Sequence, residues 1–401
     1  MNVQATIGAR VRNLRKWRKM RLADVAAIAG MSVSNLSMIE NGQRPLDSRR
    51  YIAGLANALR VAESEIVEGP HLTTDPDQSA PHAIVPALRT ALVGNDLDDP
   101  MNDRADPLSE LADLLHGRMA TSEETGDYVT RGELAAKLLN ELPVHVATGD
   151  EHDRQIALTL IIEACRAAGM TLRHLNHSDL AYVASQKALE AARILDDPVI
   201  SARVAFTRSM TMPRGSWDRP LIMVTRAADR LQPLLGSRAA DETYGQLHLA
   251  GALYASVLYK HDDVKAHLAE AHKTAKRIGE RAGAFGTFGP TNVGIWQVAI
   301  AIEQRDYKRA VHLAKDVKAD QLTNRERIAT FHGDYGRALC HVRRDEDAIE
   351  QIAKAETFAP QRVRNSPPVK EAVGVIFRRS SIDSDNRELR AMAARFGVLT
   401  S

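Results

Sequence analysis

The first 68 residues carry apolar side chains at the three- and four-residue intervals of amphipathic helices. Glycine, asparagine and proline interrupt these intervals and separate short helices from one another. We therefore predict a bundle of five helices in this segment. The expected helices cover residues 7–18, 22–29, 32–40, 47–59 and 64–67. Asp47 is placed to cap the fourth helix.

The second and third of these helices have the spacing of a helix-turn-helix. Ala26 is small enough for two steeply crossing helices to touch. Gly30, four residues later, tolerates the positive φ of a tight turn. Leu36 and Ile39 then close the third helix onto the second. A helix held in this way can lie in the major groove of DNA.

Polar residues at the start of the third helix are candidates for reading bases. The helical spacing predicts that they lie on its outer face, and they are Ser32, Ser34, Asn35 and Ser37. Asparagine suits adenine, whereas serines discriminate poorly, so we expect modest direct readout with DNA shape or water adding specificity. The alternative is that Asn35 only caps or solvates the helix.

Positive charge is concentrated in the same segment. Residues 1–70 hold 11 Lys and Arg against 6 Asp and Glu, a net charge of +5, and the total of +2 leaves −3 for residues 71–401. Seven of the basic residues lie between Arg10 and Arg21. Because neutralised phosphates release counterions, a basic module beside a helix-turn-helix favours DNA binding over a merely solvated helix face.

The run from Gly8 to Leu59 resembles the Cro and phage-repressor type of helix-turn-helix, the XRE family, and the resemblance covers residues 5–67. It implies a five-helix, lambda-repressor-like domain with base contacts from the four polar residues above. It also implies phosphate contacts from Arg15, Arg18, Asn41 and Arg44. Many members begin the second helix with a glutamine that bonds a phosphate, and Ala23 stands there in this chain, so one contact is missing.

Two irregular stretches follow the first domain. Residues 69–82 contain prolines and threonines without apolar periodicity, which predicts a linker. Residues 94–107 are rich in aspartate and predict an exposed loop, since they lack the glycine and terminal glutamate of an EF-hand calcium loop. The expected division is a DNA-binding domain at 1–68, a linker at 69–82 and a helical domain at 83–401.

The helical domain carries a repeated pattern. Its clearest copy matches the spacing of a tetratricopeptide (TPR) repeat at His332, Tyr335, Gly336, Leu339, Ala348, Ile352, Ala355 and Pro360. Looser copies of the second helix of such a repeat cover 179–192, 261–275 and 306–317. The whole chain is therefore expected to be all-α, with a TPR-like α-solenoid after the helix-turn-helix domain. Such solenoids present a concave surface to a ligand.

The first helix of each pair is expected to line that surface. The expected inner helices cover 203–212, 246–258, 288–298 and 330–339. Gly-Pro-Thr-Asn within residues 285–296 is unusual for a solenoid helix, whereas aromatic walls and an amide suit a pocket. Candidate ligand contacts are Arg208, His248, Tyr254, Phe288, Asn292 and Trp296. Core packing is an equal alternative for the aromatic residues, while a pocket is favoured for Asn292.

Motifs for catalysis, cofactors and metals are missing from the sequence. It contains no HExxH, GxSxG or P-loop pattern, and Cys165 and Cys340 form no CxxC. We therefore expect no catalytic residues, no cofactor and no metal site. Apolar runs look too short to span a bilayer and the start of the sequence shows no signal peptide, so we expect a cytoplasmic protein.

A Cro-type helix-turn-helix joined to a TPR-like domain resembles the quorum-sensing regulators of the RRNPP type, by architecture. The resemblance implies a homodimeric transcriptional regulator that binds a palindromic operator in double-stranded DNA and a signalling peptide. The alanine- and arginine-rich composition leaves a small signalling molecule open as the ligand. One alternative is a scaffold whose solenoid binds a partner protein. An enzyme with a DNA-binding domain is disfavoured, because no acid, base or nucleophile constellation appears.

Overall fold

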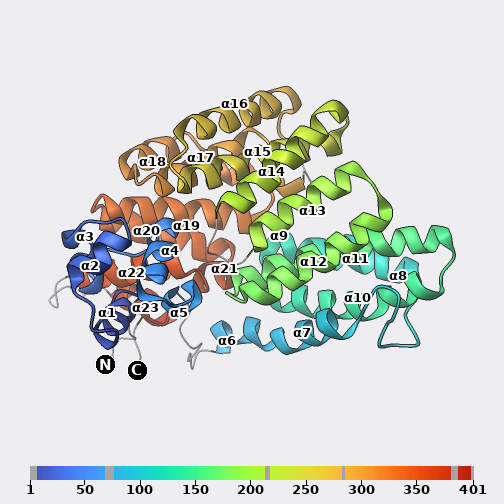
Figure 1. The fold of residues 1–401 in the computed structure, drawn as a ribbon, viewed down its shortest axis with the longest axis horizontal. Coiled ribbons are helices and arrows are strands. Elements are labelled where there is room, and N and C mark those ends of the chain that lie inside the picture. The colour runs from blue at the N-terminus through green and yellow to red at the C-terminus, as the bar shows by residue number, and fades with distance from the viewer. Residues whose placement is uncertain (1–6, 68–75, 213–216, 282–284, 381–386, 399–401) are drawn as a thin grey trace.

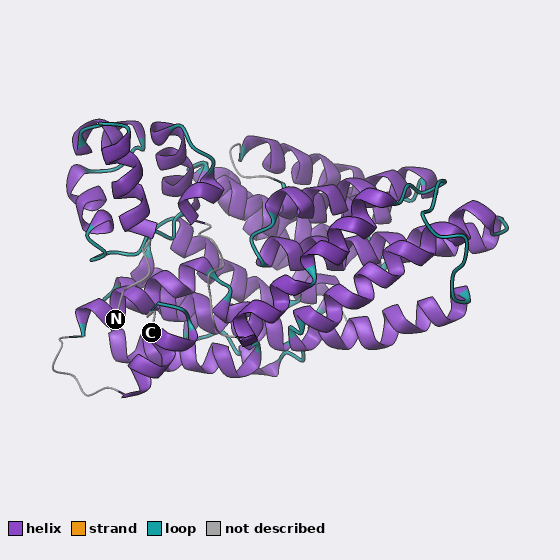
Figure 2. Cartoon of the chain, turned by 90° about the horizontal axis from the view of Figure 1, so that it is seen from below, coloured by secondary structure: helices purple, strands orange, loops and turns teal. Residues whose placement is uncertain are grey.

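The structure is a computed structural model that describes residues 7–67, 76–212, 217–281, 285–380 and 387–398. Over these residues the chain forms helices and no strand, which confirms the all-α prediction (Figures 1 and 2). A single bridge between Leu235 and Ser237 is the one β-type contact in the described ranges.

Five short helices form the N-terminal domain, named the head (residues 7–67). They are α1 (Ile7–Trp17), α2 (Leu22–Ile28), α3 (Val33–Glu40), α4 (Arg49–Leu59) and α5 (Glu63–Val67). Their apolar faces meet in one core that includes Val11, Ala26, Leu36 and Leu55, all fully buried. The predicted five-helix bundle is therefore confirmed, with ends within one or two residues of those expected.

The turn between α2 and α3 follows the expected steric logic. The chain bends by 110° between the two helices. Gly30 adopts a φ of +67°, which a residue with a side chain rarely takes. The Met31 N–H donates to the Ala26 carbonyl at 3.0 Å, and the Ser32 hydroxyl accepts from the Asn35 N–H at 3.2 Å to cap α3. These bonds fix the angle at which α3 leaves the head.

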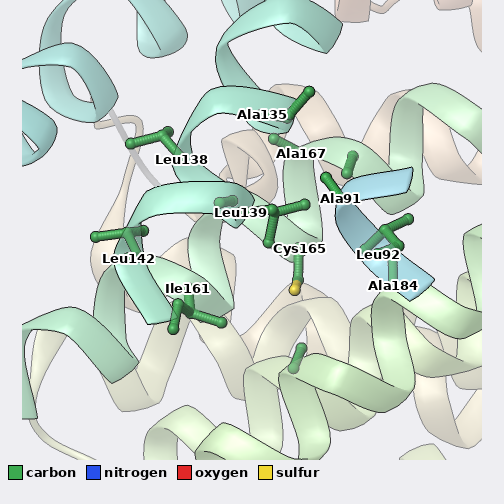
Figure 3. Close-up of a cluster of buried hydrophobic side chains, with 14 of the residues drawn as sticks. Ala91, Leu92, Ala135, Leu138, Leu139, Leu142, Ile161, Cys165, Ala167 and Ala184 are labelled. Carbon is green, nitrogen blue, oxygen red and sulfur yellow. The ribbon is translucent and has the colours of Figure 1, made fainter. Parts of the chain in front are cut away.

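The second domain, named the solenoid (residues 76–398), begins with a group of helices around two long ones. They are α6 (Pro76–Ala83), α7 (Val85–Gly94), α8 (Leu108–Leu114), the π-helix η1 (Leu115–Met119), α9 (Ala120–Thr125), α10 (Tyr128–Thr148), α11 (Glu151–His174) and α12 (Ser178–Leu195). Figure 3 shows side chains of α7, α10, α11 and α12 meeting around Leu139 and Cys165, which are both fully buried. The predicted loop at 94–107 is confirmed by the gap between α7 and α8.

The remaining helices continue as antiparallel pairs. They are α13 (Pro198–Thr211), α14 (Asp218–Leu231), η2 (Gln232–Leu234), α15 (Arg238–Val257), α16 (His261–Ile278), η3 (Phe285–Thr287), α17 (Pro290–Glu303), α18 (Tyr307–Ala314), η4 (Ala319–Gln321), α19 (Arg325–His341), α20 (Asp345–Phe358), α21 (Pro360–Arg364), α22 (Pro367–Arg379) and α23 (Arg387–Arg395). The first helices α11, α13, α15, α17, α19 and α22 contact one another in sequence and form one row. This row is the arrangement expected of an α-solenoid.

Small residues bring the paired helices together as the TPR pattern predicts. At Gly336 of α19, an added Cβ would lie 2.7 Å from Cγ1 of Ile352 and 3.0 Å from the Ala348 carbonyl oxygen in α20. Real Cβ atoms are essentially never found 2.7 Å from another atom, so a side chain at this position would have to push Ile352 aside, and glycine allows the close packing of α19 and α20.

The two ends of the solenoid are joined. α21 contacts α6, and α19 contacts α9. The carboxylate of Glu326 accepts from Nη2 of Arg131 and from the hydroxyl of Tyr128, both at 2.9 Å. Burial alone would raise the pKa of Glu326, but Arg131 and the neighbouring cations lower it well below the ordinary value. The carboxylate is therefore charged and holds early and late helices together.

Two expectations from the sequence need correction. The predicted linker at 69–82 is helical from residue 76, because α6 packs against α10 and α21, and residues 69–75 lie outside the described ranges. The apolar runs were expected to be too short for a bilayer, yet α11 is long and apolar enough by length and composition. Its apolar window is 67% buried between α10 and α12, which is typical of a core helix.

Candidate nucleic-acid interface and ligand site

The outward face of α3 is built from its first turn. Ser32, Val33 and Ser34 are exposed, and Ser37 is half-buried one turn later. The structure thus places the three predicted serines on the outer face. Val33, which the sequence reasoning passed over, keeps 46% of its surface accessible beside them. The sequence did carry a signal for Val33, namely an apolar residue at the exposed N-terminal end of the third helix. A valine there can contact the methyl group of thymine.

Asn35 lies elsewhere, and its expected place on the outer face is wrong. Its side chain is buried, with 5% of its surface exposed, and its Oδ1 accepts from Nη1 of Arg44 at 2.7 Å. Asn35 is buried because successive side chains of an α-helix are rotated by about 100° about the helix axis. Residues 35, 36, 39 and 40 form the buried face of α3, so Asn35 points toward the loop that follows the helix.

The four predicted phosphate contacts fall into two groups. Arg18 and Asn41 are exposed. Arg15 is mostly buried and forms a bidentate ion pair with Glu40, with both N–O distances at 2.7 Å, which ties α1 to α3. Arg44 is half-buried and bonded to Asn35. Direct phosphate contact is therefore open to Arg18 and Asn41, and also to the half-buried Arg44, which Asn35 holds in place, while Arg15 serves the packing of the head.

Further cations lie near this surface. Arg12 is exposed and its Nη1 lies 3.5 Å from Oδ1 of Asn41, at the end of α3. Lys16 and Lys19 are exposed on α1 and the turn after it. These residues belong to the basic run seen in the sequence, and they remain available to a polyanion.

The head is docked on the solenoid through a buried ion pair. Asp47, in the loop before α4, accepts from Nη2 of Arg337 at 3.0 Å and from Nε2 of His341 at 3.1 Å. Burial would raise the pKa of Asp47, but these two groups lower it far below its ordinary value. The expected role of Asp47 as a helix cap is wrong, because Ser48 occupies the N-cap position of α4.

Three consecutive head residues continue this contact at the start of α4. Arg49 pairs with Glu303, Tyr51 accepts from Arg305, and the guanidinium of Arg50 lies 3.9 Å from the ring centre of Tyr259. The solenoid residues stand at or just after the carboxyl ends of α15 and α17. Helix carboxyl ends carry partial negative charge, so a basic helix start is complementary to them.

The end of α3 is held by α22. Nε of Arg378 donates to the Gly42 carbonyl at 2.9 Å, and Nη2 of Arg379 donates to the Gln43 carbonyl at 3.3 Å. The Ile7 N–H donates to Glu371 at 3.0 Å on the other side of the head. The head therefore contacts residues at or near the carboxyl ends of four successive first helices of the row, α15, α17, α19 and α22. Figure 1 shows the head at the left of the molecule, beside α20 and α22.

Three of the predicted ligand-binding residues are buried in the core of the solenoid. Phe288 is fully buried in a hydrophobic cluster, and Trp296 belongs to the same cluster with 8% of its surface exposed. Asn292 is fully buried, donates to the Gly286 carbonyl at 3.1 Å and accepts from Nε of Arg327 at 2.6 Å. Both ends of its amide are satisfied, so it positions η3 and α19, and the core alternative describes this segment.

The other three predicted contacts do not converge on one site. Nδ1 of His248 lies 2.9 Å from Nδ1 of His267, and burial beside His267 lowers the pKa of His248 to about 3. Arg208 is half-buried on α13. Tyr254 alone lines a cavity, of about 40 Å³, at the head–solenoid boundary. A larger hollow of about 350 Å³ between α16, α17 and α18 is lined by none of the six.

No group of three or more histidine, cysteine or acidic residues within the described ranges is placed to hold a metal ion.

Residues 6–68 match the family model described as a helix-turn-helix domain. The head is a helix-turn-helix domain.

No curated protein matches the chain. Among solved structures, PlcR from Bacillus thuringiensis with the peptide PapR7 and DNA is 10% identical, over 88% of this chain and 95% of that chain, with a TM-score of 0.21. Apo ComR from S. thermophilus is 11% identical, over 78% and 94%, with a TM-score of 0.20. Apo ComR, the competence regulator from Streptococcus vestibularis, is 13% identical, over 82% and 98%, with a TM-score of 0.21. Likenesses at these TM-scores are too weak to assign a function.

Proposed function

We propose that this protein is a cytoplasmic, sequence-specific DNA-binding transcriptional regulator without enzymatic activity of its own. The outward face of α3 supports the proposal: Ser32, Val33 and Ser34 offer hydroxyl and methyl groups to base edges in the major groove. Exposed cations on and after α1 supply phosphate contacts on the same domain. The serines give modest discrimination, so DNA shape adds specificity.

The regulator acts as a homodimer on a palindromic operator. One head buries little DNA surface, and two heads on half-sites about one helical turn apart supply the affinity that one lacks. Dimerisation through the solenoid is what the resemblance to the RRNPP type implies.

The solenoid senses a signalling ligand, a peptide or a small molecule. The docking contacts support this part of the proposal, because Asp47, Arg49 and Tyr51 of the head are held by α17 and α19 and the turn after α17. A ligand that binds one arrangement of these helices better than another changes the position of the head and so the affinity for DNA.

The test is selection of DNA fragments from a random library by the full-length protein, followed by fluorescence anisotropy with the selected sequence and a shuffled one. We expect a selected palindrome that binds at least tenfold more tightly than the shuffled sequence. Failure to select any sequence, with equal affinity for both duplexes, would reject the proposal.

Two matched variants locate the interface. Val33→Asp places a negative charge on the outward face of α3, and we expect operator affinity to fall at least tenfold through repulsion of phosphates. Val183→Asp makes the same change at a residue of α12 with 38% of its surface exposed and should leave DNA binding unchanged. Equal affinities for the two variants would place the DNA elsewhere.

A further inference from the structure

A short segment of the chain, η3, lies on the inner face of the solenoid. Tyr244 and His248 of α15 contact the second helix α16. Glu242 and Gln246 stand two positions before them, about 200° around α15, so they face away from α16. This is the side that a solenoid turns toward its concave surface, and η3 is bound to it.

The main chain of η3 is held by buried polar side chains. The Phe285 N–H donates to Oε2 of Glu242 at 2.9 Å. Nε2 of Gln246 donates to the carbonyls of Phe285 and Gly286 at 3.3 and 2.7 Å, and Nδ2 of Asn292 donates to the Gly286 carbonyl at 3.1 Å. The side chains of Glu242, Gln246 and Asn292 are all buried. Because a buried polar group without a partner is costly, any segment that replaces η3 must offer these side chains the same main-chain groups.

The side chain of Phe285 adds a second anchor. Its ring is half-buried and lies edge-to-face with Phe206 of α13, at 5.7 Å between the ring centres. The guanidinium of Arg203, also on α13, lies 4.8 Å from the centre of the same ring. Main-chain bonds combined with one side-chain contact are how a groove recognises a peptide. The inner face therefore treats η3 as it would treat a short peptide.

The backbone of η3 is strained. Gly286 and Thr287 both have a φ of +57°, which threonine rarely adopts. Gly286 is exposed, and an added Cβ there would lie 2.6 Å from Nε2 of Gln246. Strain of this kind persists only while the surrounding contacts hold it, and it is common in segments that switch. The strain makes η3 a weaker occupant of the inner face than an unstrained peptide with the same groups.

We propose that η3 is an internal ligand of the solenoid, and that a signalling peptide with an aromatic residue followed by glycine binds by displacing it. The main chain of the peptide takes over the bonds to Glu242, Gln246 and Asn292, and its ring takes the place of Phe285. A segment of the same chain competes at a high effective concentration, so a free peptide binds only where it fits the site better than η3 does. This inference names the ligand of the sensor and in that respect rests on the proposed function.

Displacement of η3 has a direct route to the head. η3 precedes α17, and Asn292 in the first turn of α17 is bonded to Gly286. The other end of α17 holds the head through the ion pair between Glu303 and Arg49. A peptide that replaces the contacts of η3 has a different affinity for each position of α17, which couples peptide binding to the position of the head.

The experiment is a titration by saturation-transfer difference NMR on the full-length protein. The probe is acetyl-Phe-Gly-Thr-amide, which has the sequence of η3. We expect Phe285→Ala to bind the probe at least tenfold more tightly than the wild type does, because the internal competitor loses its aromatic anchor while the site keeps Arg203 and Phe206. Acetyl-Ala-Gly-Thr-amide, which lacks the ring, should bind this variant at least tenfold more weakly than the probe.

Two further variants make the result specific to η3. Phe358→Ala makes the same change at a half-buried phenylalanine of α20, in another helix pair, and should bind the probe like the wild type. Gly286→Val changes no residue of the site but disfavours the positive φ that η3 requires, so it should show the same gain as Phe285→Ala. It also serves as the release variant if Phe285→Ala does not fold.

Gln246→Leu, added to the release variant, removes the donor to both carbonyls and should abolish the gain. Equal affinity of the wild type and the release variants for the probe, or a gain that survives Gln246→Leu, overturns the inference. A protein that selects an operator but shows no gain counts against the role of η3 alone, whereas a missing operator counts against the proposed function.

Discussion

The carboxylate of Asp47 lies 3.0 Å from Nη2 of Arg337, and both side chains are buried although they belong to different domains. The two residues are 290 positions apart in the sequence. A buried ion pair of this kind contributes little net stability compared with an apolar pair, but removing one partner leaves an uncompensated charge. The pair therefore specifies how the head sits on the solenoid.

Asp47→Asn should destabilise the protein by about 1.5–3 kcal/mol, because Arg337 and His341 lose their hydrogen bonds to a buried carboxylate, while Asp334 still pairs with Arg337 at 2.7 Å. Urea unfolding followed by circular dichroism measures the change in free energy. Asp24→Asn is the matched control, since Asp24 pairs with Arg21 on the exposed surface of the same head, and we expect no measurable change there. A similar free energy of unfolding for the two variants would mean that the head is not held by Asp47.

His248 should make the stability depend on pH. Burial beside His267 lowers the pKa of His248 to about 3, against an ordinary value of 6.5. Between these values the unfolded chain binds a proton that the folded protein does not, so the free energy of unfolding falls as the pH falls, by up to about 1.4 kcal/mol per unit. His248→Gln should lose less stability than the wild type between pH 7.5 and 5.5.

Histidine substitution at an exposed site provides the comparison for that experiment. His152→Gln changes an exposed residue of α11 and should keep the wild-type pH dependence. A His248→Gln variant that loses as much stability on acidification as His152→Gln would show that the buried imidazole is not the group responsible.

The sequence predicts the helices of this protein well because their signal is local. Gly30, Ala26 and the cap at Ser32 act within a few residues of one another, and the periodicity of the paired helices needs no distant partner. The prediction that Asp47 caps α4 also rested on a local signal, its place just before the helix. Its true partners stand at the end of α19, and nothing in the neighbouring residues signals them.

The ligand site was less accessible to sequence reasoning. Asn292 was chosen as an unusual amide in a helical segment, yet Arg327 and the Gly286 carbonyl satisfy it inside the core. Of the residues that line the cavity at the domain boundary, the sequence predicted only Tyr254, because the others come from α4 of the head and from the segment α11 to α15 and meet only in the fold. Asn35 shows how one position, or about 100° of helix rotation, separates an exposed residue from a buried one.

Gly336→Ala should destabilise the solenoid by about 1–2 kcal/mol. The new Cβ would press on Ile352 and on the backbone at Ala348, and this overpacking exceeds the gain in helix propensity. Gly117→Ala is the control, because no atom lies within 4 Å of a Cβ built there, so propensity alone acts and the protein should become slightly more stable. Thermal unfolding of both variants shows whether each change raises or lowers the stability. A stabilised Gly336→Ala variant would refute the close approach of α19 and α20.

Arg18→Ala should weaken binding to the selected operator and to shuffled DNA alike. Loss of one phosphate contact reduces the slope of log K against log salt by about 0.9. Lys276→Ala removes an exposed cation from α16, away from the head, and should leave the slope unchanged. Anisotropy titrations at several salt concentrations measure the slopes, and equal slopes for the two variants would remove Arg18 from the interface.

Asn35→Ala separates two roles for Asn35, the predicted base-reading residue that the structure buries. As a base reader, Asn35 would lose affinity for the operator and keep its affinity for shuffled DNA. In the observed geometry its Oδ1 holds the guanidinium of Arg44, so the variant should instead weaken both duplexes by the same factor, about two- to tenfold for one lost charge-assisted hydrogen bond. Arg44→Ala should reproduce that loss, and the double variant should be no weaker than either single one because both changes remove the same contact. A loss confined to the operator would show that Asn35 leaves Arg44 and turns outward when DNA binds.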